Sequence, residues 1–408
     1  MSTLFSYLSQ IEGDKQPRVH SYATHVHSTL TLKAVAKRAQ TFRNQHAELA
    51  GARVALTLTA SAEALIHMVA LDGFVAELIL LPVDYAVPNG CHFHLTERGQ
   101  LRELNDFQSD SLPVVTQWGL LDEHSELISY TFDELAANEL VATGSREHAL
   151  RWGVMQEPAQ LAGLLVWLRA LKNGEDIVLA QANSLKALAD MFSHAGVTAI
   201  AAPPRLWRNL LAAGDLSRLH LEFAIVNGGL VDEPTLQRIR NIFPGAMVAH
   251  AFSHTGAGVS WLITDGKPGL PAALFEQAED KVVLEVNQGR LDIEFTGSGA
   301  TIHTEYLVEQ AKDGRVMIVG HQDTIVSVGG RDVHPEQVEI ALMEIPGVMD
   351  VQASSMPDPV LGELIRVDVL APGYRSVAER KVFKRTLQDH CREVLEPWQR
   401  PVRYYFHS

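Results

Sequence analysis

The stretch that decides the fold runs from Val328 to Val369 and reads VGGRDVHPEQVEIALMEIPGVMDVQASSMPDPVLGELIRVDV. Apolar residues first recur at helical spacing and then form two short β-type runs, and a long amphipathic helix follows them. The expected helix, two strands and final helix cover 336–344, 348–354, 364–370 and 378–395. We therefore expect residues 320-408 to form a small α+β unit of their own.

This stretch resembles the C-terminal domain of the adenylate-forming superfamily, the AMP-binding group that includes acyl- and aryl-CoA ligases, luciferase and peptide-synthetase adenylation domains. That family carries Gly-x-x-Val-x-Pro-x-Glu-Val-Glu, then Pro-Gly-Val, then Pro-Asp with Gly-Glu shortly after. The matching residues are Gly330, Val333, Pro335, Val338 and Glu339, then Pro346-Gly347-Val348, then Pro357-Asp358 and Gly362-Glu363. Gln337 is the departure in the first motif, since the family has glutamate there.

The rest of the chain resembles the same family in the same order, over 53–84, 152–180, 197–213 and 223–258. Helical patterns alternate there with apolar runs, which predicts βαβ units and parallel sheet. Short β-type runs joined by Gly and Asp follow after about residue 260. The resemblance implies an adenylate-forming enzyme fold of the α/β class. Its parts would be a large αβ-layered N-terminal domain over 1-319, with a β-rich part at about 260-319, and a C-terminal α+β domain hinged near Asp323.

Composition limits the partners. The 408 residues include 34 Lys and Arg against 49 Asp and Glu, a formal net charge of −15. We expect no nucleic-acid partner and no membrane insertion from so acidic a chain without a long apolar run. The two cysteines, Cys91 and Cys391, exclude a disulfide framework and suit a reducing compartment. The N-terminal residues lack a signal-peptide pattern, so a cytoplasmic location is expected.

Adenylate formation from a carboxylate and ATP needs phosphate donors, a magnesium site and a cation at the reacting phosphorus. The family's phosphate loop should lie between about 128 and 150, where this sequence has no lysine and no glycine-rich run; the fragment 142–145 is a weak substitute. The loop with the catalytic lysine should follow 397–401, and the sequence stops at Ser408 without it. The family's magnesium glutamate, ribose aspartate and a further arginine are replaced by Gly256, Tyr306 and His321. In a shifted register, Glu305 could take the place of the ribose aspartate.

Other family positions are kept. The resemblance implies a ligand pocket lined by Gly228, Gly229, Phe252, His254, Thr255 and Gly256, and a thioester tunnel beside Gly329 and Gly330. Glycine lets a ligand approach the backbone closely, but the same glycines also suit ordinary turns, and both interpretations stay open.

Histidines supply the weaker candidates. His254 and His303 are candidate acid–base groups, because the family brings their loops together near His250. Two clusters, His20/His25/His27 and Cys91/His92/His94, are more typical of surface or loop residues than of metal sites, so no metal site is predicted. The basic stretch 380–385 is expected to be a solvated helix face that could also contact an acidic carrier protein.

The sequence thus predicts a degenerate, non-adenylating homologue of acyl/aryl-CoA ligases, without a cofactor. Its partner would be an acyl or aryl thioester, or an acyl carrier protein, in a fatty-acid-like or polyketide-like pathway. One alternative is a divergent but active ligase that uses ATP and Mg²⁺. The other is a non-catalytic scaffold subunit, and a homo-oligomer is also left open.

Overall fold

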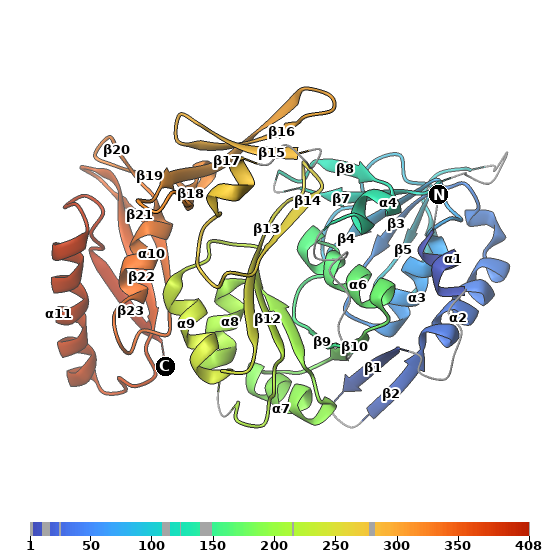
Figure 1. Cartoon of the computed structure of the whole chain (residues 1–408), viewed down its shortest axis with the longest axis horizontal. Helices are drawn as coiled ribbons and strands as arrows, with labels where there is room; N and C mark the ends of the chain where they lie inside the picture. Colours follow the sequence, from blue (N-terminus) through green and yellow to red (C-terminus); the bar gives the residue numbers. More distant parts are fainter. Residues whose placement is uncertain are drawn as a thin grey trace. The chain divides into compact units, whose positions relative to one another are not determined.

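The computed structural model describes residues 3–9, 17–23, 26–107, 115–122, 124–138, 149–213, 216–276 and 282–407. The chain divides into two compact units (Figure 1). The first comprises Met1–Pro203, Asp215–Gly228 and Ile242–Thr264, and the second comprises Pro204–Gly214, Gly229–Asn241 and Asp265–Ser408. Each unit contains its own cluster of buried apolar side chains.

An eight-stranded sheet carries the candidate site in the first unit. Its order is β14 (Val259–Ile263), β13 (Met247–His254), β12 (Phe223–Asn227), β11 (Ala199–Ala202), β9 (Arg151–Val154), β10 (Asp176–Ala180), β1 (Arg18–Ala23) and β2 (Val26–Thr31). Neighbours from β13 to β1 are parallel, and the two edge strands are antiparallel. The central strands are apolar nearly throughout, as a sheet covered on both faces requires.

A second, six-stranded sheet lies in the same unit. Its order is β6 (Leu101–Glu103), β5 (Phe93–Leu95), β3 (Arg53–Thr57), β4 (Glu77–Leu81), β7 (Gln117–Leu121) and β8 (Leu127–Tyr130). The helices of the unit are α1 (Leu4–Ser9), α2 (Leu32–Gln45), η1 (Ala47–Leu49), α3 (Ala62–Leu71), α4 (Phe132–Ala136), α6 (Leu161–Asn173) and α7 (Leu185–Ala195). Trp118, Trp152 and Trp167, from β7, β9 and α6, are fully buried in one shared core.

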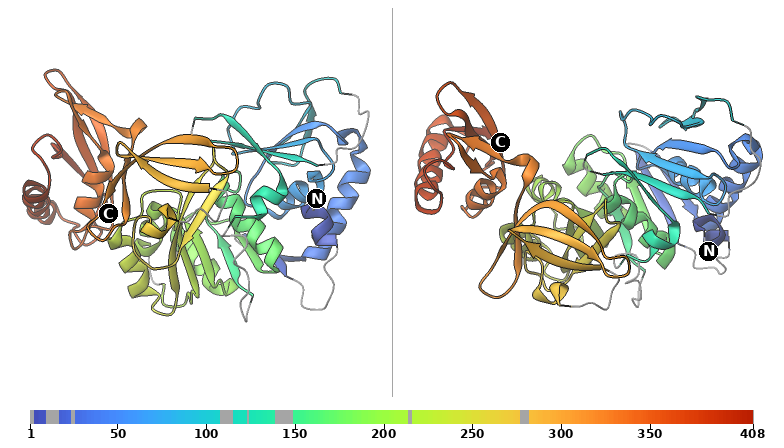
Figure 2. Two further views of the ribbon diagram at one scale, coloured as in Figure 1. Left: turned by 45° about the horizontal axis from the view of Figure 1, so that its top comes forward. Right: turned by 90° about the horizontal axis from the view of Figure 1, so that it is seen from above.

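The second unit combines two helices, α8 (Pro204–Ala212) and α9 (Glu233–Ile242), with two antiparallel-rich sheets. The first sheet contains β15 (Val282–Asn287), β16 (Arg290–Phe295), β17 (Ala300–Gln310) and β18 (Val316–His321), yellow to orange in Figure 2. The second has the order β20 (Arg331–Val333), β19 (Val326–Val328), β22 (Gly362–Leu370) and β21 (Asp350–Asp358), with β23 (Arg403–His407) paired to β22. The remaining helices are η2 (Ala272–Phe275), η3 (Gln322–Thr324), α10 (Pro335–Met343) and α11 (Val377–Val394).

A buried arginine links α8 and α9 to the last sheet. The Arg208 guanidinium donates to Asp232 at 3.0 Å and to Asp350 at 2.6 Å. All three side chains are at most 9 % exposed. Because removing one partner of such a group leaves a buried charge uncompensated, these contacts are strong constraints on local packing.

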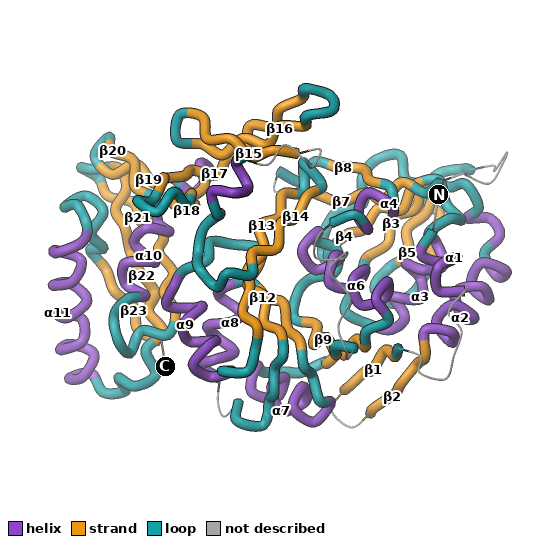
Figure 3. The backbone as a smooth tube through the Cα atoms, in the orientation of Figure 1, coloured by secondary structure: helices purple, strands orange, loops and turns teal. Residues whose placement is uncertain are grey.

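The expected α/β fold is confirmed, and helices and strands alternate from α6 to β13 as the sequence pattern indicated (Figure 3). The features that were not expected include the β1–β2 hairpin, the edge strand β14 and the length of β17. The predicted domain boundaries and the hinge stay predictions. Within the described ranges, no helix has both the length and the apolar character that crossing a bilayer demands.

We expect Glu339 of α10 to make the free energy of unfolding of the second unit depend on pH. Its carboxylate accepts the Ala353 amide at 2.8 Å, and burial raises its pKa to about 7. Arg208, Glu336 and Asp350 also act on this group. The folded form therefore binds a proton more tightly than the unfolded form, so stability should fall as pH rises from about 4.5 to above 7.

We expect Glu339→Gln, which keeps the shape and removes the titration, to flatten this fall in urea-unfolding free energies measured between pH 5 and 8. Glu379→Gln is the control, because Glu379 is exposed and its pKa is lowered. An unchanged pH slope in Glu339→Gln would contradict the assignment.

Candidate functional site

The carboxyl ends of parallel strands are the usual place for a ligand site in an α/β sheet. In the first unit, β9, β12 and β13 end with polar side chains at this edge: Gln156, Asn227 and His254. β12 and β13 are hydrogen-bonded neighbours, with Asn227 opposite Ala251. The site is therefore assembled from segments about 100 residues apart in the sequence.

Gln156 and Asn227 hold each other by two amide hydrogen bonds. Gln156 Nε2 donates to Asn227 Oδ1 at 2.6 Å, and Asn227 Nδ2 donates to Gln156 Oε1 at 3.1 Å. Gly228 follows with a φ of +69°, which favours glycine, and a Cβ there would lie 3.7 Å from Gln156 Nε2. This amide pair thus fixes the turn after β9 against the turn after β12.

In the segment from Phe252 to Gly256 the side chains of Phe252 and His254 are buried, and the other residues are partly exposed. The Phe252 ring stacks on Trp261 of β14 at 5.8 Å between centroids. His254 is 5 % exposed, and its Nδ1 accepts the Ala257 amide at 3.1 Å, so a neutral ring carries its proton on Nε2. A Cβ at Gly256 would lie 3.1 Å from His254 Cε1. A Cβ at position 256 would therefore make a tight contact with the imidazole ring, which would have to shift by a few tenths of an ångström.

Two side chains of the same unit hold the turn after Thr255: Tyr130, the last residue of β8, and Asn138, which follows α4. The Tyr130 hydroxyl donates to the Thr255 carbonyl, and Asn138 Nδ2 donates to the Gly258 carbonyl at 3.3 Å. Burial raises the pKa of the Tyr130 hydroxyl, which stays protonated and remains a donor. Gly258 has a φ of +65°, and a Cβ there would lie 2.4 Å from the Tyr130 ring.

A pocket of about 470 Å³ opens on the other side of the β9 turn. It lies between the carboxyl ends of β9 and β10 and the first turns of α7. The lining residues are Ala60, Val154, Met155, Gln156, Glu157, Pro158, Ala180, Ala182, Asn183, Ser184, Leu185 and Leu188. Gln156 belongs both to this pocket and to the amide pair with Asn227. The volume is within the range that small-molecule sites usually have.

The β9 turn depends on Gly163 of α6. A Cβ at Gly163 would lie 2.2 Å from the Glu157 carbonyl oxygen, so only glycine lets this turn rest on the helix. Gln156 and Glu157 were not among the sequence candidates. Their position, two polar residues directly after a buried parallel strand, is the signal that could have identified them.

The other predicted site residues lie in the second unit. Gly229 begins its segment there, and a Cβ on it would lie 3.2 Å from Pro204 Cδ. His303 is on β17, largely exposed, with Nδ1 3.1 Å from an Asp292 oxygen. Its expected meeting with His250 and His254 stays a prediction.

Gly329 and Gly330 form the two-residue turn between β19 and β20. Their φ angles are +59° and +78°, which is the type I′ pattern that joins tightly paired strands. The hairpin alone therefore requires glycine at both positions. Their proposed role in a thioester tunnel stays a prediction.

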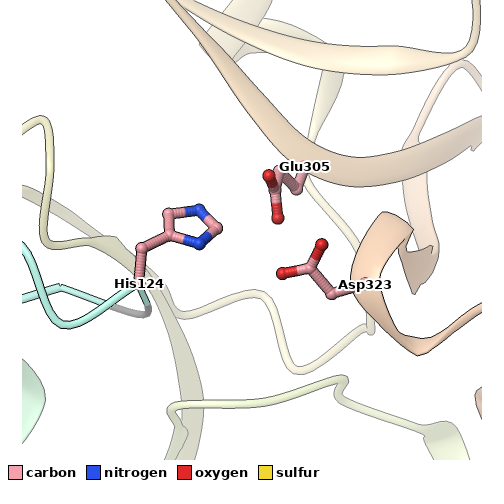
Figure 4. Close-up of side chains that lie close together, drawn as sticks. All are labelled: His124, Glu305 and Asp323. Atoms are coloured by element: carbon pink, nitrogen blue, oxygen red, sulfur yellow. The ribbon is translucent and has the colours of Figure 1, made fainter.

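The predicted hinge residue, Asp323, lies in η3 and faces Glu305 of β17 (Figure 4). His321 lies beside both acids: its Nδ1 is 3.7 Å from a Glu305 oxygen and 3.9 Å from an Asp323 oxygen. The Tyr306 ring meets His321 edge-on at 5.2 Å. Two acids and a phenol thus surround His321, which stands where the resemblance implies an arginine.

The described residues of the histidine cluster around His20 and of the Cys91/His92/His94 cluster make ordinary contacts within the protein. His20 contacts Thr29 and Asp176, each at 3.2 Å, His92 accepts the Arg53 amide at 2.9 Å, and His94 lies 2.9 Å from Thr57. Cys91 is buried in an apolar cluster. His25 and the fragment 142–145 lie outside the described residues.

Comparison with solved structures identifies this architecture. E. coli MenE with bound OSB-AMS superposes with a TM-score of 0.74 at 15 % identity, covering 100 % of this chain and 96 % of that one. The anthranilate CoA ligase AuaEII in complex with anthranoyl-AMP also gives 0.74 at 15 % identity, covering 100 % and 93 %. ATP-bound MatB from Rhodopseudomonas palustris gives 0.71 at 16 % identity, covering 99 % and 94 %.

Sequence comparison agrees over a shorter range. The human mitochondrial acyl-coenzyme A synthetase ACSM5 is 34 % identical over 98 residues, which are 24 % of this chain and 17 % of that protein. Its Rattus norvegicus counterpart is 31 % identical over 143 residues, or 35 % and 23 %. The chain has the fold of adenylate-forming enzymes, and over 24 % to 35 % of its length its sequence is similar to acyl-coenzyme A synthetases.

The sequence matches span about a fifth of the length of these relatives, and no family model matches the chain. The whole-chain likeness to the superfamily is therefore one of fold. A shared fold does not determine an activity, so the activity of this chain depends on its own site residues.

The turn around Gly258 gives a direct test of the site's packing. Gly258→Ala should lower the free energy of unfolding by about 1–3 kcal/mol, because the left-handed conformation is strained and the methyl group meets the Tyr130 ring. Gly245→Ala is the matched control, since a Cβ there has nothing within 4 Å. Urea unfolding of both variants measures the difference, and equal stabilities would show that Tyr130 does not pack on this turn.

Proposed function

We propose that the chain is a non-adenylating relative of acyl/aryl-CoA ligases that binds an acyl or aryl thioester, presented by CoA or by an acyl carrier protein. Under this proposal the fold supplies a ligand-binding edge on the eight-stranded sheet. The chemistry of adenylate formation is lost, and ATP and Mg²⁺ are not used.

The observation that carries the proposal is the packing of His254 against Gly256. The resemblance implies a magnesium-binding glutamate at position 256. Here a Cβ alone would lie 3.1 Å from His254 Cε1 and 3.5 Å from Nδ1. The ring is held in place by the Ala257 amide and is buried. Position 256 thus has no carboxylate, and a side chain there would require the His254 ring to shift by a few tenths of an ångström. Magnesium prefers carboxylate oxygen ligands.

The charges of the residues at the carboxyl edge of the eight-stranded sheet also argue against ATP binding. The segments 154–158, 226–229 and 252–258 contain no lysine or arginine. Transfer at a phosphoryl group relies on cations and oriented donors at the phosphate oxygens. The polar groups at this edge, a pair of amides and an imidazole, suit an uncharged ligand better than a polyphosphate.

The position in the second unit where the resemblance implies a ribose-binding aspartate also departs from the family. The resemblance implies an aspartate where Tyr306 stands, and Tyr306 lies inside strand β17 with its amide donating to Thr304 Oγ1 at 3.2 Å. A phenol packed edge-on against His321 offers one hydroxyl in place of a bidentate carboxylate acceptor. This position therefore also supports loss of nucleotide binding.

The direct test is calorimetric titration of the chain with acyl- and aryl-CoA thioesters and, separately, with ATP and Mg²⁺. We expect micromolar binding of at least one thioester and millimolar or no binding of ATP. Micromolar ATP binding would instead support a divergent active ligase, and silence in both titrations would support a scaffold.

Two asparagine variants test where on the chain the thioester binds. Asn227→Ala removes the partner of Gln156 and should weaken thioester binding by about tenfold, the effect of roughly one hydrogen-bonded constraint. Asn241→Ala removes an exposed asparagine whose side chain accepts a hydrogen bond from Gln237 in the same helix, and should change nothing. Equal affinities in both variants would place the thioester elsewhere.

A further inference from the structure

The β1–β2 hairpin carries a row of polar side chains that the proposed thioester site does not use. In the antiparallel register His20 stands opposite Thr29, and Tyr22 stands opposite His27. Directly opposed residues share a face of the sheet, and so do residues two apart in one strand, so these four side chains lie on one face. His20 also contacts Asp176, the first residue of the neighbouring strand β10. The hairpin thus brings together two imidazoles, a hydroxyl and a carboxylate.

The hydrogen bonds among these groups form a chain with a fixed direction. His20 Nε2 lies 3.2 Å from Asp176 Oδ2, and His20 Nδ1 lies 3.2 Å from Thr29 Oγ1. A carboxylate only accepts, so the ring proton of a neutral His20 is on Nε2 and its lone pair is on Nδ1. This lone pair accepts the Thr29 hydroxyl. His27 Nε2 lies 3.2 Å from the same hydroxyl oxygen and donates to it.

The carboxylate of this chain is held in place by the surrounding strands. Asp176 Oδ1 accepts the Arg18 amide at 2.8 Å, and Oδ2 accepts Arg151 Nε at 3.1 Å. Burial acts to raise the pKa of this carboxyl group, but these contacts and the His20 hydrogen bond outweigh burial and lower the pKa. Asp176 is therefore ionised at neutral pH and fixes the orientation of the His20 ring.

The base is shielded from solvent, whereas the hydroxyl is accessible. His20 is 7 % exposed, and both Thr29 and His27 are exposed. The His27 ring is held by stacking on Tyr22, with 4.2 Å between the ring centroids. A hydroxyl beside an imidazole whose second nitrogen is held by a carboxylate is the arrangement that activates serine and threonine as nucleophiles.

The strand β2 also offers donors for a developing negative charge. It is the edge strand of its sheet, and no described strand pairs with its outer side. Alternate residues of an edge strand direct their N–H groups outward. Either the Thr29 amide, or the amides of Ser28 and Leu30, therefore point away from β1. Backbone N–H groups are the usual donors to the oxyanion of an acyl-transfer intermediate.

We propose that Thr29 is the nucleophile of an esterase-type activity on activated acyl esters and thioesters, with His20 as the general base and Asp176 as a positioning residue. Thr29 Oγ1 bonds to the acyl carbon, its proton passes to His20 Nδ1, and the leaving oxygen or sulfur departs with that proton. Water then attacks the acyl-threonine ester with His20 again as the base. This second step releases the carboxylic acid and restores the hydroxyl.

This cluster is separate from the proposed thioester site. Asp176 begins β10 and accepts the amide of Arg18, which begins β1, so the carboxylate lies at the amino ends of these parallel strands. The proposed thioester site lies at the carboxyl ends of β9, β12 and β13. The two proposals hold or fail independently, because acyl transfer to Thr29 from a small ester does not require the thioester site.

The test uses the full chain with p-nitrophenyl acetate as the acyl donor. We expect release of p-nitrophenol in excess of the amount of chain, and mass spectrometry should find the acetyl group on Thr29. Thr29→Val keeps the shape without the hydroxyl and should release p-nitrophenol at least about 100-fold more slowly, since a positioned base contributes roughly that factor. Thr29→Ser keeps the hydroxyl and should remain active.

Thr41→Val is the matched control for the loss of a hydroxyl. The exposed Thr41 hydroxyl donates to the Lys37 carbonyl at 3.0 Å, and its removal should not change the rate. No release above the rate in buffer, equal rates in Thr29→Val and the unmodified chain, or acetyl groups found only on other residues would each overturn the proposal.

A variant of His20 tests its role as the base. His20→Ala should stop acetylation of Thr29, and added imidazole should restore part of it by entering the space of the missing ring. The readout is acetylated Thr29 by mass spectrometry, because imidazole alone also cleaves the ester. A purely structural role would not respond to imidazole, so failure of this rescue would contradict the assignment of His20.

Two variants of Asp176 test its positioning role. Asp176→Asn has the same shape, but its amide can donate to His20 Nε2 and so move the ring proton to the nitrogen that faces Thr29. Acetylation of Thr29 should slow in Asp176→Asn and recover in part in Asp176→Glu, which keeps an acceptor. A purely structural role would favour the isosteric asparagine, so the opposite order of rates would refute this role.

Discussion

A buried ion pair beneath the eight-stranded sheet holds together the strands on which the candidate site depends. Arg169 of α6 lies 3.1 Å from Glu175, which directly precedes β10, and both side chains are at most 2 % exposed. The same glutamate accepts the Trp152 indole N–H at 2.6 Å. The guanidinium lies 5.3 Å from the Trp152 ring and 5.6 Å from the Phe223 ring. One charge pair thus contacts α6, β9, β12 and the start of β10 at once. A buried pair of this kind is tolerated only when every partner is in place, which makes the spacing of these strands difficult to alter.

The candidate site lies at the opposite, carboxyl end of the same strands, and these strands hold it rigid. β9 leads to Gln156 and β12 leads to Asn227, and the two amides can pair only because the strands are fixed at the right separation. Gly163, six residues before Arg169 on α6, lets the β9 turn rest on the helix. Preorganised neutral groups of this kind lose little entropy when they bind an uncharged ligand. The contact between the His254 ring and position 256 is equally close, because a Cβ there would lie 3.1 Å from His254 Cε1.

Much of the fold could be predicted from the sequence. The segments 176–180, 290–295 and 364–370 are strands almost as predicted, because short apolar runs between Gly and Asp turns have few alternatives. The β1–β2 hairpin was missed because RVHSYA and VHSTLT are polar and form the sheet edge. The strand β17 was missed because its residues, ATIHTEYLVEQ, are mostly exposed or half-buried and have no regular apolar pattern.

The site was predictable only in part. Phe252, His254 and Gly256 were found because a motif with fixed spacing marks them. The resemblance could not show that a Cβ at Gly256 would crowd the His254 ring, since that depends on a side-chain conformation. Glu157 and its pocket were invisible for a similar reason: the pocket walls come from 60, 154–158 and 180–188, and only the folded sheet brings them together. The glycines 329 and 330 show the reverse case, because a hairpin turn accounts for both without any ligand.

The central claim is that this adenylate-forming fold no longer forms adenylates. The most direct measurement is exchange of labelled pyrophosphate into ATP by the full chain, with Mg²⁺ and a panel of aliphatic and aromatic carboxylic acids. This exchange reports reversible adenylate formation whatever the later acceptor is. The account predicts no exchange above background with any acid, while the same preparation still binds a thioester. Acid-dependent exchange with even one member of the panel would contradict it and would show an active ligase.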